Sequence, residues 1–211
     1  MRHRTFGIAI LAIVAFAAGL LIARSMTPPK PVPPRTERAT VFDAPRPLPS
    51  LSLVDQDGRR WGNDRFAGRW TLVFFGYTSC PDVCPTMLAT LVQMRKALAD
   101  LPPSEQPRVL FVSVDPERDD PARLAAYVRF FDATFEGATG DARGVADAAA
   151  AFGVPYLKVD VPGGGYNMDH GSGLFLVGPD GTIVAYSSAP HDAAVLARDY
   201  RSIVTSLGVA P

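Results

Sequence analysis

Two cysteines and one histidine are the residues of this chain whose types and spacing could carry chemistry. Cys80 and Cys84 are the two cysteines among 211 residues, and they form a CxxxC pattern. They follow an apolar run at 70–76 and precede a helical pattern, so we expect both at a helix N-terminus, where the helix dipole and free N–H groups stabilise thiolates. Soft thiolates suit Cu(I), whereas zinc and iron–sulfur sites need more ligands than this pair supplies.

The cysteine pair also has other interpretations. A structural disulfide would close a very short loop and contribute little chain-entropy stabilisation. A thiol–disulfide oxidoreductase would use the pair for exchange, although disulfide reductases carry CxxC rather than CxxxC. A thiol peroxidase would need an activated cysteine beside residues such as Thr78 and Arg129, and nothing in the sequence shows that these converge.

The chain has three histidines, and His170 is the one whose setting points to a ligand. Three glycines at 163–165 precede it, which indicates a flexible loop, and an apolar strand is predicted directly after it at 173–177. A histidine just before such a strand can face the cysteine loop. Cys80, Cys84 and His170 would then form a three-coordinate copper site, because imidazole suits Cu(II) and thiolates suit both oxidation states.

Neighbouring residues are weaker candidates. Asp169 either orients the imidazole through a hydrogen bond or is a simple loop acid. Asp82 lies between the cysteines and could cap the helix or tune the thiols. Asp115 follows a strand at the same edge of the sheet, although an Asp-Pro pair more often forms a turn. His191 is expected at the start of the last helix rather than on a metal.

The elements that must position these residues alternate between strands and helices. Apolar runs at 70–76 and 109–114 predict buried strands, and hairpins are predicted at 51–61 and 173–186. Helices are expected after Cys84, from a cap at Asp120, over 142–152, and from a cap at Asp192 to Gly208, with Leu207 on the inner face of the last one. This order predicts a three-layer α/β domain.

The N-terminal part differs in composition from the rest. We interpret residues 1–24 as an uncleaved membrane anchor, because an apolar run follows Arg2 and Arg4; the alternative is a cleaved signal peptide. Residues 25–47 are predicted to be a Pro-rich linker in an extended, semi-rigid conformation, and residues 48–211 to be the folded domain. Both interpretations of the N-terminus place the domain outside the cytoplasm. The formal net charge is zero, so nucleic acid is not an expected partner.

Three motifs together resemble the Sco/SenC family. They are FFGYTSCPDVCPTML at 74–88, SVDPERDDP at 113–121 and DHGSGLFLVGPDG at 169–181. The resemblance implies a thioredoxin-like fold with a β-hairpin insertion and one copper ion bound by Cys80, Cys84 and His170. It also implies a role in assembling the dinuclear copper centre of cytochrome c oxidase. Family relatives with thiol-reductase activity commonly carry a cis-proline before the strand that faces the cysteines, and this chain has no proline from 163 to 178, which favours metal binding.

The expected function is therefore a copper metallochaperone, not an enzyme, that carries Cu(I) or Cu(II) to cytochrome c oxidase subunit II. It would be tethered to a bacterial inner membrane with its domain in the periplasm, and would receive copper from an upstream donor. In an oxidising compartment Cys80 and Cys84 tend to form a redox disulfide, so a thioredoxin-like reductase is an expected partner. The alternative function is a thiol–disulfide oxidoreductase that keeps a client's copper-ligand cysteines reduced.

Overall fold

The computed structural model describes residues 34–208, together with residues 16, 18 and 19 near the N-terminus. The predicted anchor at 1–24 lies, apart from those three residues, outside the described part of the chain, as does the first part of the predicted linker. Across everything that the structure describes, no helix is both long and apolar enough to cross a membrane.

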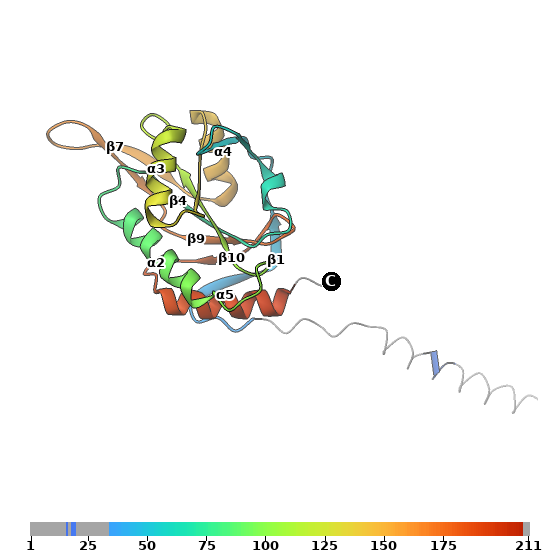
Figure 1. Ribbon diagram of the computed structural model, residues 1–211. Helices are drawn as coiled ribbons and strands as arrows, with labels where there is room; N and C mark the ends of the chain where they lie inside the picture. Colours follow the sequence, from blue (N-terminus) through green and yellow to red (C-terminus); the bar gives the residue numbers. More distant parts are fainter. Residues whose placement is uncertain (1–15, 17, 20–33, 209–211) are drawn as a thin grey trace, which may run out of the picture. The chain divides into compact units, whose positions relative to one another are not determined.

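An eight-stranded mixed sheet forms the centre of the domain (Figure 1), in the order β1-β10-β9-β4-β5-β6-β2-β3. The strands are β1 (Ala39–Pro47), β2 (Leu53–Asp55), β3 (Arg60–Trp61), β4 (Thr71–Gly76), β5 (Arg108–Ser113), β6 (Glu136–Thr139), β9 (Leu174–Val177) and β10 (Thr182–Ser187). All six residues of β4 are buried, as its continuous apolar run predicts. It pairs in parallel with β5 and antiparallel with β9, so its carboxyl end lies at the middle of one sheet edge.

The helices begin and end largely where capping residues predict. They are α2 (Val83–Ala97), α3 (Pro121–Phe131), α4 (Ala142–Phe152) and α5 (Ala193–Leu207), with a short 3₁₀ helix η1 (Asn63–Phe66). The Asp120 carboxylate accepts from the N–H of Arg123, and Asp192 accepts from two N–H groups at the start of α5. Gly153 ends α4 with a φ of 71°, the left-handed conformation that glycine adopts without strain.

Alternating side chains of β4 show that the helices form two layers around the sheet. Phe74 packs near Phe111 of β5, which in turn contacts Tyr127 of α3, with ring centroids 6.2 and 5.5 Å apart. Phe75 points to the opposite face and packs against Phe152 of α4 at 5.2 Å. Helix α2 lies beside α5 (Figure 1). The expected three-layer α/β arrangement is confirmed.

A β-hairpin separate from the main sheet is inserted between α4 and β9. It consists of β7 (Tyr156–Asp160) and β8 (Tyr166–His170), which pair antiparallel with Tyr156 opposite His170. Three consecutive glycines with φ near +90° make its turn, which reaches away from the body of the domain in Figure 1. The hairpin insertion that the family resemblance implies is therefore present, and His170 is its last strand residue.

The N-terminal edge of the domain differs from the sequence interpretation. The linker was expected to run to residue 47, but β1 covers Ala39–Pro47 and pairs antiparallel with β10. Prolines are tolerated there because β1 is an edge strand, and its register shifts between Val41 and Arg46. Leu207 is also a correction, since 37 % of it is exposed at the end of α5.

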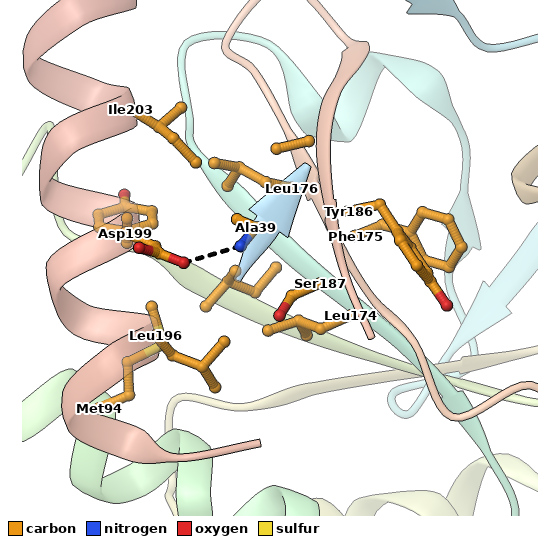
Figure 2. A pocket seen from close by; sticks show the side chains of 13 residues that line it. Ala39, Met94, Leu174, Phe175, Leu176, Tyr186, Ser187, Leu196, Asp199 and Ile203 are labelled. Carbon is orange, nitrogen blue, oxygen red and sulfur yellow. Dashed lines mark hydrogen bonds between the residues drawn. The ribbon is translucent and has the colours of Figure 1, made fainter. Parts of the chain in front are cut away.

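A buried carboxylate holds the start of β1 to α5. Asp199 accepts hydrogen bonds from the backbone N–H groups of Glu37, Arg38 and Ala39 at 2.6, 2.9 and 2.8 Å. Figure 2 shows the Asp199 carboxylate directed at the N–H of Ala39, beside a small apolar cavity between α5 and the sheet. The charge of Asp199 is thus satisfied by backbone donors rather than by a cation, as burial of a carboxylate requires.

Candidate metal centre

The two cysteines lie where β4 passes into α2. The backbone N–H of Cys80 donates to the carbonyl of Tyr77 at 3.2 Å, which closes a turn directly after the strand. Cys84 is in the first turn of α2, and its N–H donates to Cys80 Sγ at 3.5 Å. The predicted position at a helix N-terminus is confirmed. Both thiols are free, so the redox disulfide between them stays a prediction.

The absence of a side chain at Gly76 makes room for the Cys84 thiol. A Cβ atom placed on Gly76 would lie 2.7 Å from Cys84 Sγ and 2.7 Å from Phe111 Cε2, far inside van der Waals contact. Cys84 and Phe111 are both completely buried. Glycine at the last residue of β4 is therefore what lets the helix seat its thiol against the sheet.

The surroundings shift the pKa values of the two thiols in opposite directions. A hydrogen bond from the Cys84 thiol, followed by backbone N–H groups of Cys84 and Asp82, lowers the pKa of Cys80 to about 5, although burial opposes the shift. The same hydrogen bond to Cys80, together with burial, raises the pKa of Cys84. At neutral pH the pair is consequently a partly exposed thiolate beside a buried, protonated thiol.

His170 brings its Nε2 atom to the cysteines from the end of β8. Nε2 lies 3.6 Å from Cys84 Sγ, and Nδ1 lies 2.9 Å from the carbonyl oxygen of Gly171. Because a carbonyl only accepts, Nδ1 carries a proton, so the free lone pair of an uncharged ring is on Nε2, the atom that faces Cys84. The rings of Tyr77 and Phe74 pack edge-on against the imidazole at 5.9 and 6.3 Å. A metal ligand needs this tautomer and a fixed ring.

Two open grooves lie beside the site. One has a volume of about 370 Å³ beside His170 and is lined by residues of the hairpin, including Leu157. The other, of about 270 Å³, lies beside the start of α2 and includes Val83. Leu157 and Val83 are 65 % and 50 % exposed, which is unusual for such apolar side chains on this domain. A partner could therefore approach the imidazole and the start of α2 from solvent.

Neither Asp169 nor Asp82, the two acids that could have oriented the imidazole, forms a hydrogen bond with it. Residues alternate along β8, so Met168 and His170 face inward while Asp169 is exposed on the opposite face. The carbonyl of Gly171, rather than the carboxylate of Asp169, accepts from the imidazole and orients it. Asp82 is the residue before α2, and its carboxylate accepts from Thr86 Oγ1 at 3.3 Å; its backbone N–H, rather than its side chain, contributes to the Cys80 thiolate.

The other candidate residues have hydrogen-bond partners outside the proposed metal site. Thr78 and Arg129 do not converge: Arg129 pairs with Asp57 at 2.7 Å, while Thr78 bonds to Asp119. His191 precedes α5 as expected, with Nε2 2.9 Å from the Ser172 carbonyl. In the described part of the chain, no three His, Cys, Asp or Glu side chains already form a group that could hold a metal ion.

Sequence reasoning missed Asp119. This carboxylate is completely buried and accepts from both the N–H and the hydroxyl of Thr78, at 2.8 and 2.5 Å, two residues before Cys80. Asp115, at the same sheet edge, is buried against Arg118 rather than against the cysteines. The only signal in the sequence was the dense run of acidic residues in SVDPERDDP, which surface loops also contain.

Comparison with known proteins agrees with this geometry. The sequence profile of the SCO1/SenC family matches residues 44–205. A protein of Stutzerimonas stutzeri whose assigned name proposes copper binding is 37% identical over 158 residues, covering 73% of this chain and 76% of that protein. The structure of Arabidopsis thaliana ScoI with copper bound matches with a TM-score of 0.71 at 29% identity, covering 75% of this chain and 98% of that one. Bradyrhizobium japonicum ScoI with copper bound matches at 0.66 and 34% identity, over 74% and 98%.

Some curated relatives extend well beyond the match. The chain spans 54% of the mitochondrial SCO2 homolog of Bos taurus and 60% of that of Mus musculus. The expected thioredoxin-like α/β fold of Sco proteins is confirmed by the structural matches. Because the family profile covers most of the chain and a relative is 37% identical over three quarters of its own length, this chain belongs to the SCO1/SenC family.

Proposed function

We propose that this protein binds one copper ion through Cys80, Cys84 and His170 and delivers it to cytochrome c oxidase during assembly. The observation that carries the proposal is the meeting of Cys84 Sγ and His170 Nε2 at 3.6 Å, with the Nδ1 proton held by the Gly171 carbonyl. The donor set fits copper: one thiolate is already formed, and thiolate and imidazole together suit both Cu(I) and Cu(II). Relatives whose structures are described as containing copper support the choice of metal.

Each residue has a defined part in binding. Cys80 offers a partly exposed thiolate that an arriving ion meets first. Cys84 must lose its proton before it can ligate, so uptake releases a proton and weakens as the pH falls. His170 binds through Nε2, since its Nδ1 proton is held by the Gly171 carbonyl. Copper supplies no reaction here because it is the cargo.

Release is proposed to follow ligand exchange. A client cysteine or histidine entering from one of the two grooves replaces the protein's ligands one at a time, so the ion is never free. We propose cytochrome c oxidase subunit II as the client and its dinuclear copper centre as the destination. A protein from an upstream copper pathway would load the site, and a thioredoxin-like reductase would keep Cys80 and Cys84 in the dithiol form that copper requires.

Tethering to a bacterial inner membrane by residues 1–24, with the domain in the periplasm, belongs to the same proposal. Its support is the basic start and apolar run of the sequence, which favour an N-terminus in the cytoplasm. Protease protection in intact and permeabilised spheroplasts tests it. A domain that is digested only after permeabilisation would refute the outward orientation.

The test of the copper proposal is a titration of the reduced protein with Cu(I) in competition with a chelator, alongside Cu(II) absorption and EPR. We expect one copper per chain and a thiolate-to-Cu(II) charge-transfer band. His170→Ala should weaken binding and change the band, and Cys84→Ser should abolish tight binding. Asp169→Asn is the matched control, since its side chain is exposed and the imidazole's hydrogen-bond partners are Cys84 and Gly171 instead. Identical binding by wild type and His170→Ala would refute the Cys₂His site.

A thiol–disulfide oxidoreductase is the second candidate. The observation that favours it is the unequal acidity of the two thiols, which is the arrangement of an attacking and a resolving cysteine. In that case His170→Ala would retain full activity in cells, and oxidase assembly would not respond to added copper. Loss of assembly that excess copper restores would instead favour copper delivery.

A further inference from the structure

The motif SVDPERDDP, which joins β5 to α3, takes no part in the proposed copper site itself. Its side chains nevertheless contact both halves of that site: the loop that carries the cysteines and the hairpin that carries His170. The two halves are about 90 residues apart in sequence. Contacts other than the metal ligands must therefore fix the distance between the cysteine loop and the hairpin.

The cysteine loop is held through Asp119. This buried carboxylate bonds to the N–H and hydroxyl of Thr78 and also accepts from Ser113 Oγ at 2.6 Å. Arg123 adds donors from the first turn of α3, with Nε 2.7 Å from Thr78 Oγ1 and Nη2 2.9 Å from Ser79 Oγ. The two residues directly before Cys80 are consequently fixed to the motif.

The hairpin is held through Arg118. Its Nη1 donates to the backbone carbonyl of Tyr166 at 2.9 Å, its guanidinium carbon lies 3.7 Å from the centre of the Tyr166 ring, and its Nε pairs with the buried Asp115 carboxylate. The Tyr166 hydroxyl donates to Asp115 at 2.8 Å. Tyr166 is the first residue of β8 and His170 the last, on the same inward face.

These two attachments share one closed turn. The backbone N–H groups of Arg118 and Asp119 both bond to the carbonyl of Asp115, at 3.2 and 3.0 Å. Arg118 also lies 5.6 Å from the ring of Tyr77, which itself packs edge-on against the imidazole of His170. The turn therefore connects the hairpin to the cysteine loop, and loss of either attachment would let the two move relative to each other.

We propose that Arg118 is a positioning residue for His170: by holding Tyr166 at the start of β8, it sets the distance between the imidazole and the two thiols. The proposal rests on the proposed function, in which the three residues bind copper together. Met168 is buried between Tyr166 and His170 and anchors the middle of the strand. Loss of Arg118 should consequently let β8 pivot about Met168 rather than detach.

Arg118→Gln tests the proposal, because it removes the charge and leaves Asp115 buried without its cation. Hydrogen bonds to charged groups contribute enough that hairpin amides at 166–170 should exchange at least about tenfold faster in the metal-free protein. Cu(I) dissociation should accelerate by a similar factor, and the Cu(II) band should shift towards that of His170→Ala. In the His170→Ala background, Arg118→Gln should have no further effect on copper affinity.

Two further variants sharpen the result. Tyr166→Phe keeps the ring and removes only the hydroxyl, so it should show a weaker form of the same changes and serves if Arg118→Gln does not fold. Lys158→Gln is the matched control: Lys158 also lies on the Tyr166 ring, at 3.9 Å, but is exposed and pairs with exposed Glu117. It should leave amide exchange and copper dissociation unchanged.

The outcomes separate the two proposals. Unchanged amide exchange in both Arg118→Gln and Tyr166→Phe would overturn the positioning role, whether or not copper binds. Faster copper loss with unchanged exchange would overturn it too, since Arg118 would then act through its charge. If His170→Ala binds copper like wild type, the Cys₂His site fails, while the amide exchange still decides whether Arg118 holds the hairpin.

Discussion

The low pKa of Cys80 gives a quantitative prediction for its reactivity. With a pKa of about 5, Cys80 is almost entirely thiolate at pH 7 and still about three-quarters thiolate at pH 5.5. A cysteine of the unfolded chain, with a pKa of about 8.5, is about 3 % thiolate at pH 7 and about 0.1 % at pH 5.5. Since only the thiolate attacks a disulfide, the rate of folded Cys80 relative to the unfolded chain should rise about 20-fold between these pH values.

A dipyridyl disulfide reagent measures both rates by absorbance. Comparing the two pH values as a ratio cancels the limited access to Cys80 and its lower intrinsic nucleophilicity, which the low pKa also causes. The Cys84→Ala variant removes the largest cause of the shift and should raise the midpoint of the pH profile, whereas Cys84→Ser keeps a hydrogen-bond donor and should raise it less. A relative rate that stays constant between pH 7 and 5.5 would refute this account of the thiolate.

Two substitutions test the packing around the site and the N-terminal edge. Gly76→Ala places a methyl group 2.7 Å from Cys84 Sγ, so it should lower the free energy of unfolding in urea by about 1–3 kcal/mol and weaken copper binding. Gly171→Ala is the control, because the atoms nearest to its added methyl group are 3.6 Å away. Equal stabilities of the two variants would contradict the packing argument. Asp199→Asn puts an amide N–H₂ against backbone donors and should cost about 1–3 kcal/mol and speed amide exchange at residues 37–39. Arg198→Gln breaks only the exposed, solvent-screened pair with Glu37 and should change stability little, so an equal loss in both variants would exclude a special role for Asp199.

Local signals in the sequence were sufficient for most of the elements. Asp120, Asp192 and Gly153 act as the helix boundaries that their types predict, because capping depends on residues within one turn. The apolar run of β4 predicts a central strand for a similar reason. The positions of Cys80 and Cys84 followed from these elements, since a strand followed directly by a helix leaves little choice for the residues between them.

Long-range pairing is what the sequence could not supply. The strand β1 was hidden because its prolines indicate a linker, and only an edge position beside β10 makes them acceptable. The roles of Asp119 and Asp199 could not be predicted because the backbone donors that satisfy their carboxylates are about 40 and 160 residues away in sequence. The direction of Asp169 depends on the start of β8, and a shift of one residue would have turned it inward.

The attachment of β1 has a mechanical consequence. If the N-terminal part of the chain is tethered, any tension reaches the domain at the residues just before β1. Force along β1 would load its hydrogen bonds to β10 simultaneously, in shear, and the three N–H groups bound by Asp199 would bear it first. Bonds loaded together resist extension better than bonds opened one after another. A pull on the N-terminal side would thus be borne by β1, β10 and α5, elements that contribute none of the three proposed copper ligands.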